Sequence, residues 1–597
     1  MPSYNAPLRD MRFVLHEVLG VGNYQNLPGF EDASPDTVDA VIEEGAKFAQ
    51  EVLQPINQSG DREGCKWDAG NVTTPKGFKE AYKQYCEGGW TGLTSLKEYG
   101  GQGLPYYVGV LLSEIVTSAN MAWGMYPGLS HGAYEAIAAH GSDELKKTYL
   151  PKLVSGEWTG TMNLTEPHCG TDLGLMRTKA EPQPDGSYRI TGTKIFISAG
   201  EHDMTDNIVH LVLAKIVGGP EGIRGVSLFI VPKFLPNADG SPGERNGVSC
   251  GSIEHKMGIK ANATAVLNYD NAKGWLVGKA HKGMRGMFTM MNAARLGVGV
   301  QGLGLAEVSY QNGLAYAKER VQGRSLGGIK APDKAADPII VHPDVRRMLL
   351  TCKAFTEGAR MLTYWAGLNV DLAHKHPDAM ARREADDLLG LITPIVKAYQ
   401  TDMGFECANL AMQCLGGHGY IAEWGMEQFV RDARIAQIYE GANGVQALDL
   451  VGRKLPANMG RSLRTFFHPL DAFLKEQAAD AAMKDFIGPL LRAFGRLQQA
   501  TALIAEKGMA DAEEAGAASS DYLRLFALTA VGWMWAKMAR VAIDKLAAGG
   551  GEDPGFYRTK LATARFFMER MLPDTASLQQ KIQAGKRTLM ELDAAAF

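Results

Sequence analysis

The feature that most constrains the fold is a block of strand-forming residues set between two long helical stretches. Residues 1–160 have mainly helical patterns, for example at 37–53 and 77–88. Short β-rich runs separated by turn residues fill 161–280. Helical periodicity returns at 281–455, and 456–597 form a further helical, Ala-rich stretch. Helices and strands in separate blocks predict an α+β fold with these four domains, rather than alternating α/β units.

Turn-forming residues predict where individual strands, helices and loops begin and end. Asp185-Gly186 followed by a β-branched run predicts a hairpin in an antiparallel β-domain. One apolar helical face runs from Ala408 to Leu415, and Gly416-Gly417 should end that helix. The Pro-, Gly- and Lys-rich residues 327–343 predict an exposed loop. Three glycines at 549–551, followed by Glu552-Asp553-Pro554, predict a break between helices.

Composition narrows the class of protein. The net charge is −4 and the pI is about 6.4. The chain as a whole therefore has no excess of positive charge of the kind that is typical of proteins that bind nucleic acid. Seven cysteines without CxxC spacing predict reduced thiols and a cytoplasmic location. The N-terminus has no signal-peptide pattern. The most apolar window, Leu525 to Trp535, is shorter than the ~20 residues of a membrane span. We expect a buried helix there and no transmembrane segment, with contact at a membrane surface as the alternative.

Several familiar site patterns are missing from the sequence. It has no GxGxxG that opens a βαβ unit, no phosphate-binding P-loop, no HExxH and no GxSxG. Glu166, His168, Cys169 and Asp172 cluster along the chain but lack the spacing of a metal-ligand set. We therefore expect no metal site.

Three segments carry candidate chemistry. Asn163 to Asp172 is a polar turn rich in hydroxyls and backbone N–H groups, which suits a flat polar heterocycle. Lys194 to Gly200 is a strand in which Phe196 and Ser198 face the same side, so that an aromatic ring and a hydroxyl meet one ligand. In Arg431 to Asn443, Glu440 follows an apolar helical run and precedes a glycine, and a carboxylate among apolar neighbours can act as a base. Taken alone, each segment is better explained as a loop, a plain strand or a solvated helix end.

Together, these segments resemble the motifs of the acyl-CoA dehydrogenase family. Residues 164–172 resemble TEP-x-x-G-[ST]-D, and 194–198 resemble K-x-[WF]-I-[TS]. Residues 413–420 resemble Q-x-x-GG-x-G-[FY], and 431–441 resemble RD-x-[RK]-x-x-x-IYEG. The order and separation of the four motifs make coincidence improbable. The resemblance covers about residues 40–455.

The resemblance implies an N-terminal helical domain, a middle β-domain and a C-terminal four-helix bundle, with 456–597 as an additional helical domain. The long C-terminal region resembles a bacterial subgroup that includes 3-methylmercaptopropionyl-CoA and fatty acyl-CoA dehydrogenases. The resemblance to this family implies a cytoplasmic FAD flavoprotein of fatty acid β-oxidation that is a homodimer or tetramer. Such an enzyme oxidises an acyl-CoA to the trans-2-enoyl-CoA and passes electrons to electron-transfer flavoprotein.

Site residues follow from the same resemblance. Glu440 is the implied base that removes the α-proton, while the β-hydrogen leaves as hydride. Ala294 stands where some relatives place the base, which favours Glu440. The implied FAD contacts are Leu164, Thr165, Gly170, Phe196, Ser198, Arg320, Gln413, Gly416 and Gly417. The implied substrate contacts are Thr171, Arg295, Tyr439 and Gly441.

The chain departs from the family pattern after Glu440-Gly441. Relatives often have Thr-Ser-Gln there, with side chains that reach FAD, whereas this chain has Ala442-Asn443-Gly444. Gln446 lies nearby in the sequence. The 327–343 loop is also longer than in the short-chain enzymes.

Other functions compete with the dehydrogenase. An acyl-CoA oxidase would pass the electrons to oxygen, and sequence separates the two poorly. A non-enzymatic relative that binds nucleic acid would have a basic C-terminal region and no base, whereas charges after 455 are balanced and Glu440 is present. The role of 456–597 is open between subunit packing and contact with a membrane or electron acceptor.

Overall fold

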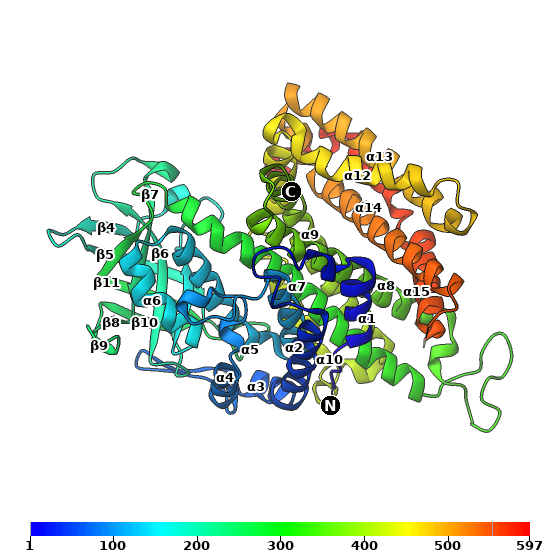
Figure 1. Ribbon diagram of the computed structural model, residues 1–597, viewed down its shortest axis with the longest axis horizontal. Helices are drawn as coiled ribbons and strands as arrows, with labels where there is room; N and C mark the ends of the chain where they lie inside the picture. Colours follow the sequence, from blue (N-terminus) through cyan, green and yellow to red (C-terminus); the bar gives the residue numbers. More distant parts are fainter. Residues whose placement is uncertain (1, 552) are drawn as a thin grey trace. The chain divides into compact units, whose positions relative to one another are not determined.

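The structure is a computed structural model that describes residues 2–551 and 553–597 (Figure 1). The chain forms two compact units. Unit 1 comprises Met1–Glu44, Val110–Glu114 and Val298–Phe597, and unit 2 comprises Gly45–Gly109 and Ile115–Gly297. The β-rich block lies in unit 2, while the N-terminal helical block contributes to both units. The α+β class is confirmed, and the four-domain boundaries stay a prediction.

A seven-stranded sheet forms the centre of unit 2. Its strands are β3 (Trp158–Asn163), β4 (Lys179–Pro182), β5 (Tyr188–Ser198), β6 (Asn207–Ile216), β7 (Val226–Pro232), β10 (Val248–Ile253) and β11 (Thr264–Val277). Strands β11, β5, β4, β6 and β7 close into a ring, because β7 pairs with both β6 and β11. β10 extends the sheet beside β11, and β3 extends it beside β6. Closure leaves few strand edges exposed. Two small pairs accompany it: β1 (Lys66–Asp68) with β2 (Asn71–Thr73), and β8 (Phe234–Pro236) with β9 (Pro242–Arg245).

The prediction of an antiparallel β-domain is right for most of the ladders and wrong for two. β4 and β5 form the hairpin predicted from Asp185-Gly186. However, β3 runs parallel to β6, from Trp158 opposite Asn207 to Asn163 opposite Val212, and β4 also pairs with β6 in parallel. A parallel pair needs a long crossover instead of a tight turn. The chain between β3 and β6 supplies that crossover, which strand patterns alone do not reveal.

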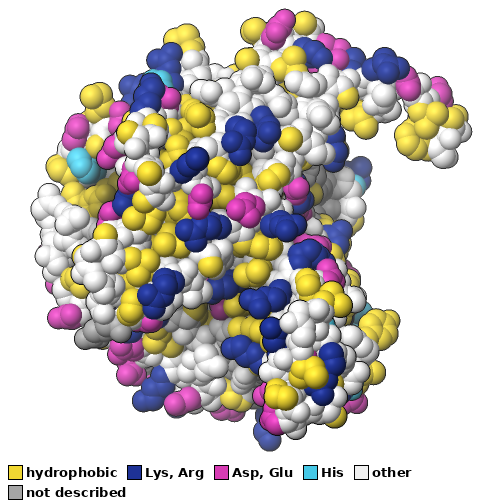
Figure 2. All heavy atoms as spheres, turned by 90° about the vertical axis from the view of Figure 1, so that its right-hand side faces the viewer, with side chains coloured by type: hydrophobic (Ala, Val, Ile, Leu, Met, Phe, Trp, Pro, Cys, Tyr) yellow, Lys and Arg dark blue, Asp and Glu magenta, His cyan; other side chains and the backbone are white. Residues whose placement is uncertain are grey.

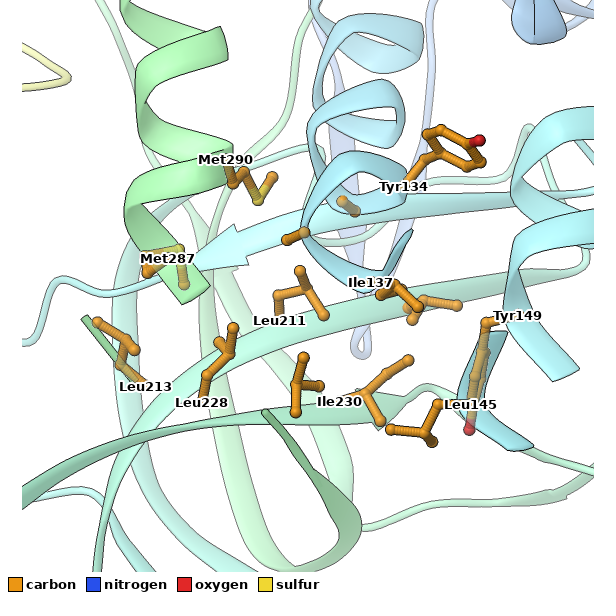
Figure 3. Close-up of a cluster of buried hydrophobic side chains, with 14 of the residues drawn as sticks. Tyr134, Ile137, Leu145, Tyr149, Leu211, Leu213, Leu228, Ile230, Met287 and Met290 are labelled. Atoms are coloured by element: carbon orange, nitrogen blue, oxygen red, sulfur yellow. The ribbon is translucent and has the colours of Figure 1, made fainter. Parts of the chain in front are cut away.

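Two hydrophobic cores flank β6. Leu211 and Leu213 join one cluster, whereas Val212 and Ala214 join the other. The apolar run of this strand is therefore explained by burial on both faces. Figure 3 shows the first cluster, in which side chains of β6 and β7 meet those of α5 (Tyr106–His140), α6 (Asp143–Ser155) and the start of α7 (Gly283–Glu319). This packing fixes the sheet against helices within unit 2. The shorter helices α3 (Asn57–Glu63) and α4 (Phe78–Glu87) belong to the same unit, and α2 (Pro35–Phe48) precedes them.

Unit 1 is built from helices. It contains α1 (Leu8–Arg12), α8 (Pro343–Lys375), α9 (Ala379–Cys414), α10 (Met426–Ala436), α11 (Asn443–Asp449), α12 (Arg461–Gln477), α13 (Lys484–Ala510), α14 (Ala512–Ala547), α15 (Pro554–Phe566), α16 (Asp574–Ala584) and α17 (Arg587–Met590). α9 ends just before Gly416, as predicted. The helical break after Ala547 is also confirmed, with Asp553 capping α15, while Glu552 lies outside the described residues.

Helix α14 is the centre of the C-terminal helices. It packs against α8, α9, α13, α15 and α16. Every residue from Leu525 to Trp535 is buried, which confirms the predicted buried helix. A helix that is apolar all round needs such a sheath of neighbours. Among the described residues, no helix has both the length and the apolar character required to cross a bilayer.

A buried ionic network links the N- and C-terminal parts of unit 1. The fully buried Arg360 of α8 donates to Asp10, Glu114 and Glu307. Lys560 of α15 donates to Asp10 and to Glu357. Buried charges of this kind persist only when paired, because desolvation of an ion is costly. Residues 456–597 are therefore an integral part of unit 1. Elsewhere the charges are mixed: on the face in Figure 2, Lys and Arg side chains lie among acidic and hydrophobic ones.

The segment 327–343 is largely exposed, as predicted, and is drawn in green at the lower right of Figure 1. One residue departs from that prediction. Asp337 is fully buried and accepts hydrogen bonds from the backbone N–H groups of Ser325 and Ala331 and from the Arg324 guanidinium. These bonds lower the pKa of Asp337 to about 2. The loop is thus organised around an internal carboxylate.

Candidate active site

In unit 2, the turn that follows β3 is organised by Glu166. Its carboxylate is 3% exposed and accepts from the backbone N–H groups of Arg177 (2.7 Å) and Thr178 (3.1 Å). The Thr178 hydroxyl donates at 2.6 Å and the buried Lys194 ammonium at 2.8 Å. Burial alone would raise the pKa of Glu166, but the Lys194 charge and these hydrogen bonds hold it below its ordinary value. The geometry favours the interpretation of Glu166 as a structural residue.

Lys194 also attaches this turn to β5. Its ammonium donates to the Leu164 carbonyl at 2.9 Å, and the Ile195 N–H donates to the Thr165 carbonyl at 2.9 Å. Both residues predicted to contact the cofactor, Leu164 and Thr165, are half-buried. Gly170 and Thr171 are exposed, and a Cβ atom at Gly170 would meet open space. The turn is therefore exposed at Gly170 and Thr171, while the hydrogen bonds from Lys194 and Ile195 attach it to β5.

Phe196 occupies an unusual place in β5. The register with β11 shifts between Lys194 and Ile197, so that Ile195 and Phe196 form a β-bulge. Phe196 has φ +60° and is 58% exposed, whereas Ile197 is buried and Ser198 is half-buried. A bulky residue with positive φ is a strained arrangement that often marks a functional site. The bulge leaves the aromatic ring exposed, and its role as a ligand contact stays a prediction.

Arg295, predicted to contact substrate, lies in the part of α7 that belongs to unit 2. It is half-buried, and its guanidinium carbon lies 5.9 Å from the centroid of the Phe288 ring. Phe288 is itself 37% exposed. The pair places a positive charge beside a partly exposed aromatic ring.

In unit 1, Glu440 lies in a tight turn between α10 and α11. Glu440 has φ +56° and Gly441 has φ +86°, so the chain passes through the left-handed region twice in succession. A hydrogen bond from the Asn443 N–H to the Gln437 carbonyl closes the turn at 3.0 Å. Only glycine adopts such φ values without cost, and a non-glycine residue there needs its conformation imposed by neighbours.

Two neighbouring side chains impose this conformation, and one of them, Lys397, was not predicted from the sequence. The fully buried Lys397 of α9 donates to the Gly441 carbonyl and to Asn443 Oδ1, both at 2.8 Å. Gln446 Nε2 donates to the Glu440 carbonyl at 3.1 Å. The only sequence signal was a lysine within the apolar helical run 391–399, where a charge is out of place.

Asn443 is one of the three residues at which the chain departs from the family pattern. Its Nδ2 donates to Asp402 Oδ1 at 2.7 Å, to Thr401 Oγ1 at 2.9 Å and to the Ala398 carbonyl at 3.1 Å. All three acceptors lie on α9. In this chain, therefore, the residue binds the turn to the neighbouring helix.

Tyr439, predicted to contact substrate, donates its hydroxyl to Gln301 Oε1. Burial and the adjacent charge of Glu440 raise the pKa of the Tyr439 phenol, which keeps the hydroxyl protonated as a donor. The bond joins the Glu440 turn to α7 within unit 1.

The remaining predicted cofactor residues lie at another surface of unit 1. Gln413, Gly416 and Gly417 are exposed at the end of α9, and Arg320 is exposed just after α7. The two helix ends meet where Tyr316 of α7 hydrogen-bonds His418. Cβ atoms at Gly416 and Gly417 would meet open space within this chain. A backbone this bare allows close approach by a ligand or a second protein.

No group of three or more His, Cys, Asp or Glu side chains suited to a metal ion occurs among the residues that the structure describes.

Four family models match consecutive parts of the chain. They are the N-terminal domain (35–157), middle domain (161–272) and C-terminal domain (281–455) of acyl-CoA dehydrogenases, and an acetyl-CoA dehydrogenase C-terminal-like domain (466–593).

Two curated relatives match over nearly the whole chain. A 3-methylmercaptopropionyl-CoA dehydrogenase of Ruegeria pomeroyi is 44% identical over 97% of this chain and 98% of its own length. A broad-specificity linear acyl-CoA dehydrogenase of Mycobacterium tuberculosis is 35% identical over 100% of both chains. Among solved structures, Caenorhabditis elegans ACDH-11 in complex with C11-CoA has a TM-score of 0.79 at 19% identity, and covers 99% of this chain and 96% of that one. At that identity it supports the fold alone.

Proposed function

Because the chain belongs to the acyl-CoA dehydrogenase family, and is therefore an FAD-dependent oxidoreductase that acts on acyl-CoA thioesters, we propose that Glu440 is its catalytic base. The observation that carries this proposal is the Glu440 turn. Two consecutive left-handed residues are held by side chains of α9 and α11, at a motif whose glutamate is the family's base. Glu166, the other glutamate of the four motifs, already accepts hydrogen bonds from Arg177, Thr178 and Lys194.

In the proposed reaction, Glu440 removes a proton from Cα of the acyl group. The electron pair of that C–H bond forms the new double bond, and the β-hydrogen leaves with its electron pair. Bound FAD supplies the hydride acceptor. The N–H of Glu440 is proposed to bind the thioester oxygen, where negative charge develops during proton removal. The product is the trans-2-enoyl-CoA.

The described surfaces fit a flavin. Thr165, Ser198 and the outward ring of Phe196 offer hydroxyls and an aromatic face for a planar heterocycle. Arg320 and the bare Gly416-Gly417 backbone suit the pyrophosphate end of FAD, from this chain or from a second copy. We propose a homodimer on this basis. Thr171, Arg295 and Gly441 are the proposed contacts to acyl-CoA, together with Tyr439.

The acyl group and the electron acceptor belong to the proposal as well. The relatives favour 3-methylmercaptopropionyl-CoA or a linear fatty acyl-CoA as the substrate. Electron-transfer flavoprotein is the proposed acceptor. Consumption of oxygen in step with substrate oxidation would instead indicate an oxidase.

The test is anaerobic bleaching of the flavin spectrum by a panel of acyl-CoAs, from short to long chains and with 3-methylmercaptopropionyl-CoA. We expect one chain class to bleach the parent protein and not the Glu440→Gln variant, which keeps the side-chain shape without the base. A yellow parent protein that no acyl-CoA bleaches would refute the proposed activity. Bleaching that persists in the variant would move the base elsewhere.

A further inference from the structure

We propose that Lys397 is a positioning residue that holds Glu440 in its reactive place. The proposal rests on the proposed role of Glu440 as the base. Lys397 is 0% exposed on α9, and its ammonium donates to the Gly441 carbonyl and to Asn443 Oδ1 at 2.8 Å each. Both acceptors lie within three residues after Glu440, in Gly441 and in the first residue of α11.

A fully buried lysine is costly to a fold, because its ammonium loses hydration that only hydrogen bonds and charges of the protein can replace. An apolar side chain would fill the same space between helices at lower cost. Here the ammonium directs its bonds to the turn. The free-energy cost of burying Lys397 is explained if the turn must adopt a single conformation.

The turn itself needs such a restraint. Glu440 is a non-glycine residue at φ +56°, a strained conformation that persists only where the surrounding structure imposes it. Lys397 and Gln446 draw the carbonyls of Gly441 and Glu440 inward. In a trans peptide the N–H points opposite to the C=O. The N–H groups of Gly441 and Ala442 therefore point away from the Lys397 and Gln446 side chains.

Asn443 completes the restraint. It accepts from Lys397 through Oδ1, and through Nδ2 it donates to Thr401, Asp402 and the Ala398 carbonyl of the same helix. The Lys397–Asn443 pair, which we call the α9 clamp, therefore binds the turn to α9 at both its carbonyl and its side chain. Asn443 stands where many relatives have a residue directed at FAD, so this chain uses the position to fix the base.

The clamp acts on geometry, and misplacement of a reacting group by about 1 Å can lower a rate about 100-fold. We expect Lys397→Met to lower kcat for the acyl-CoA that bleaches the parent by about 10- to 100-fold, with KM changed by less than about threefold. Asn443→Ala should act in the same direction with a smaller effect. Local amide hydrogen exchange of residues 437–446 should accelerate in both variants.

The matched control is Lys353→Met. Lys353 is a largely buried lysine of the same unit that pairs with Glu357 on α8. The same substitution there should lower thermal stability yet leave both kcat and exchange of the 437–446 turn as in the parent. This control separates loss of a buried cation in general from loss of the clamp.

A folded Lys397→Met protein whose kcat and turn exchange match those of Lys353→Met would overturn the proposal, as would faster exchange with unchanged kcat. If Lys397→Met does not fold, Asn443→Ala decides by the same two criteria. Should no acyl-CoA bleach the parent, the proposed function fails on its own. In that case exchange of the turn, which needs no substrate, still decides whether the clamp exists.

Discussion

Two motif turns, one in each unit, are each secured by a fully buried lysine. In unit 2, Lys194 donates directly to the Glu166 carboxylate, which also accepts from Arg177 and Thr178. In unit 1, Lys397 donates to the backbone carbonyl of Gly441 and to the Asn443 amide oxygen. The first lysine neutralises a glutamate, and the second restrains the backbone that carries one.

The difference teaches that a motif carboxylate cannot be assigned by residue type alone. Glu166 and Glu440 both lie in turns next to candidate ligand residues. What separates them is which atoms the neighbouring donors engage. A carboxylate saturated by internal donors holds structure, whereas a carboxylate on a restrained backbone is suited to react.

The largest expected effect comes from removal of the carboxylate of Glu440, the proposed base. Glu440→Gln should lower the rate of anaerobic flavin reduction by about 10²- to 10⁴-fold, the usual contribution of general base catalysis. The free energy of unfolding should change by less than about 0.5 kcal/mol, as for most substitutions outside a core. Stopped-flow reduction and urea unfolding measure the two quantities. A reduction rate within about tenfold of the rate of the parent would contradict the proposal that Glu440 reacts whereas Glu166 holds structure.

Glu166→Gln should have the opposite profile. The substitution leaves the Lys194 ammonium buried without its carboxylate, which costs about 3–5 kcal/mol of stability. The double variant Glu166→Leu with Lys194→Met removes both charges and should recover much of that loss. Urea unfolding of the three proteins checks this order. A single variant as stable as the parent would show that the ion pair is not what holds the turn.

Acid should weaken unit 2 through two buried histidines next to the Glu166 turn. His202 and His210 bond Thr159 and Thr161 of β3, and burial, with the nearby Lys233 charge, lowers the pKa of each to about 3. In the unfolded chain their pKa is about 6.5, so that state gains protons first as pH falls. Stability is therefore lost as pH drops from about 6.5 towards 3, by about 1.3 kcal/mol per histidine between pH 7 and 5.5. His210→Gln should lose about 1.3 kcal/mol less than the parent over that interval in urea unfolding at each pH. An equal loss in both proteins would mean that His210 does not titrate in this way.

The smallest effect concerns Phe196, one of the positive-φ residues of unit 2. Phe196→Gly should raise stability by about 0.5–1 kcal/mol, since glycine adopts positive φ freely and the exposed ring buries little area. The same variant should retain less FAD after gel filtration if the ring contacts the flavin. Thermal unfolding of the FAD-free protein isolates the backbone effect. A less stable variant would indicate that the ring packs on the protein.

Much of the fold was open to prediction from local patterns. The α+β class, the hairpin at Asp185-Gly186, the end of α9 before Gly416 and the buried helix at Leu525 to Trp535 follow from periodicity and turn chemistry. The parallel pairing of β3 with β6 did not, because it joins segments whose patterns look the same in either direction. Buried Asp337 was likewise hidden inside a polar loop, since its donors are backbone groups that no residue letter reveals.

The candidate site divides in the same way. The sequence by itself determined which residues are proposed to carry the chemistry, because ordered motifs name Thr165, Phe196 and Glu440 directly. Only the tertiary structure decided how those residues are held. The bulge that turns Phe196 outward, the pair of Lys194 with Glu166 and the α9 clamp beneath Glu440 all join segments far apart in the chain. Local pattern records what a residue can do, whereas its partners and conformation depend on long-range packing that no single segment encodes.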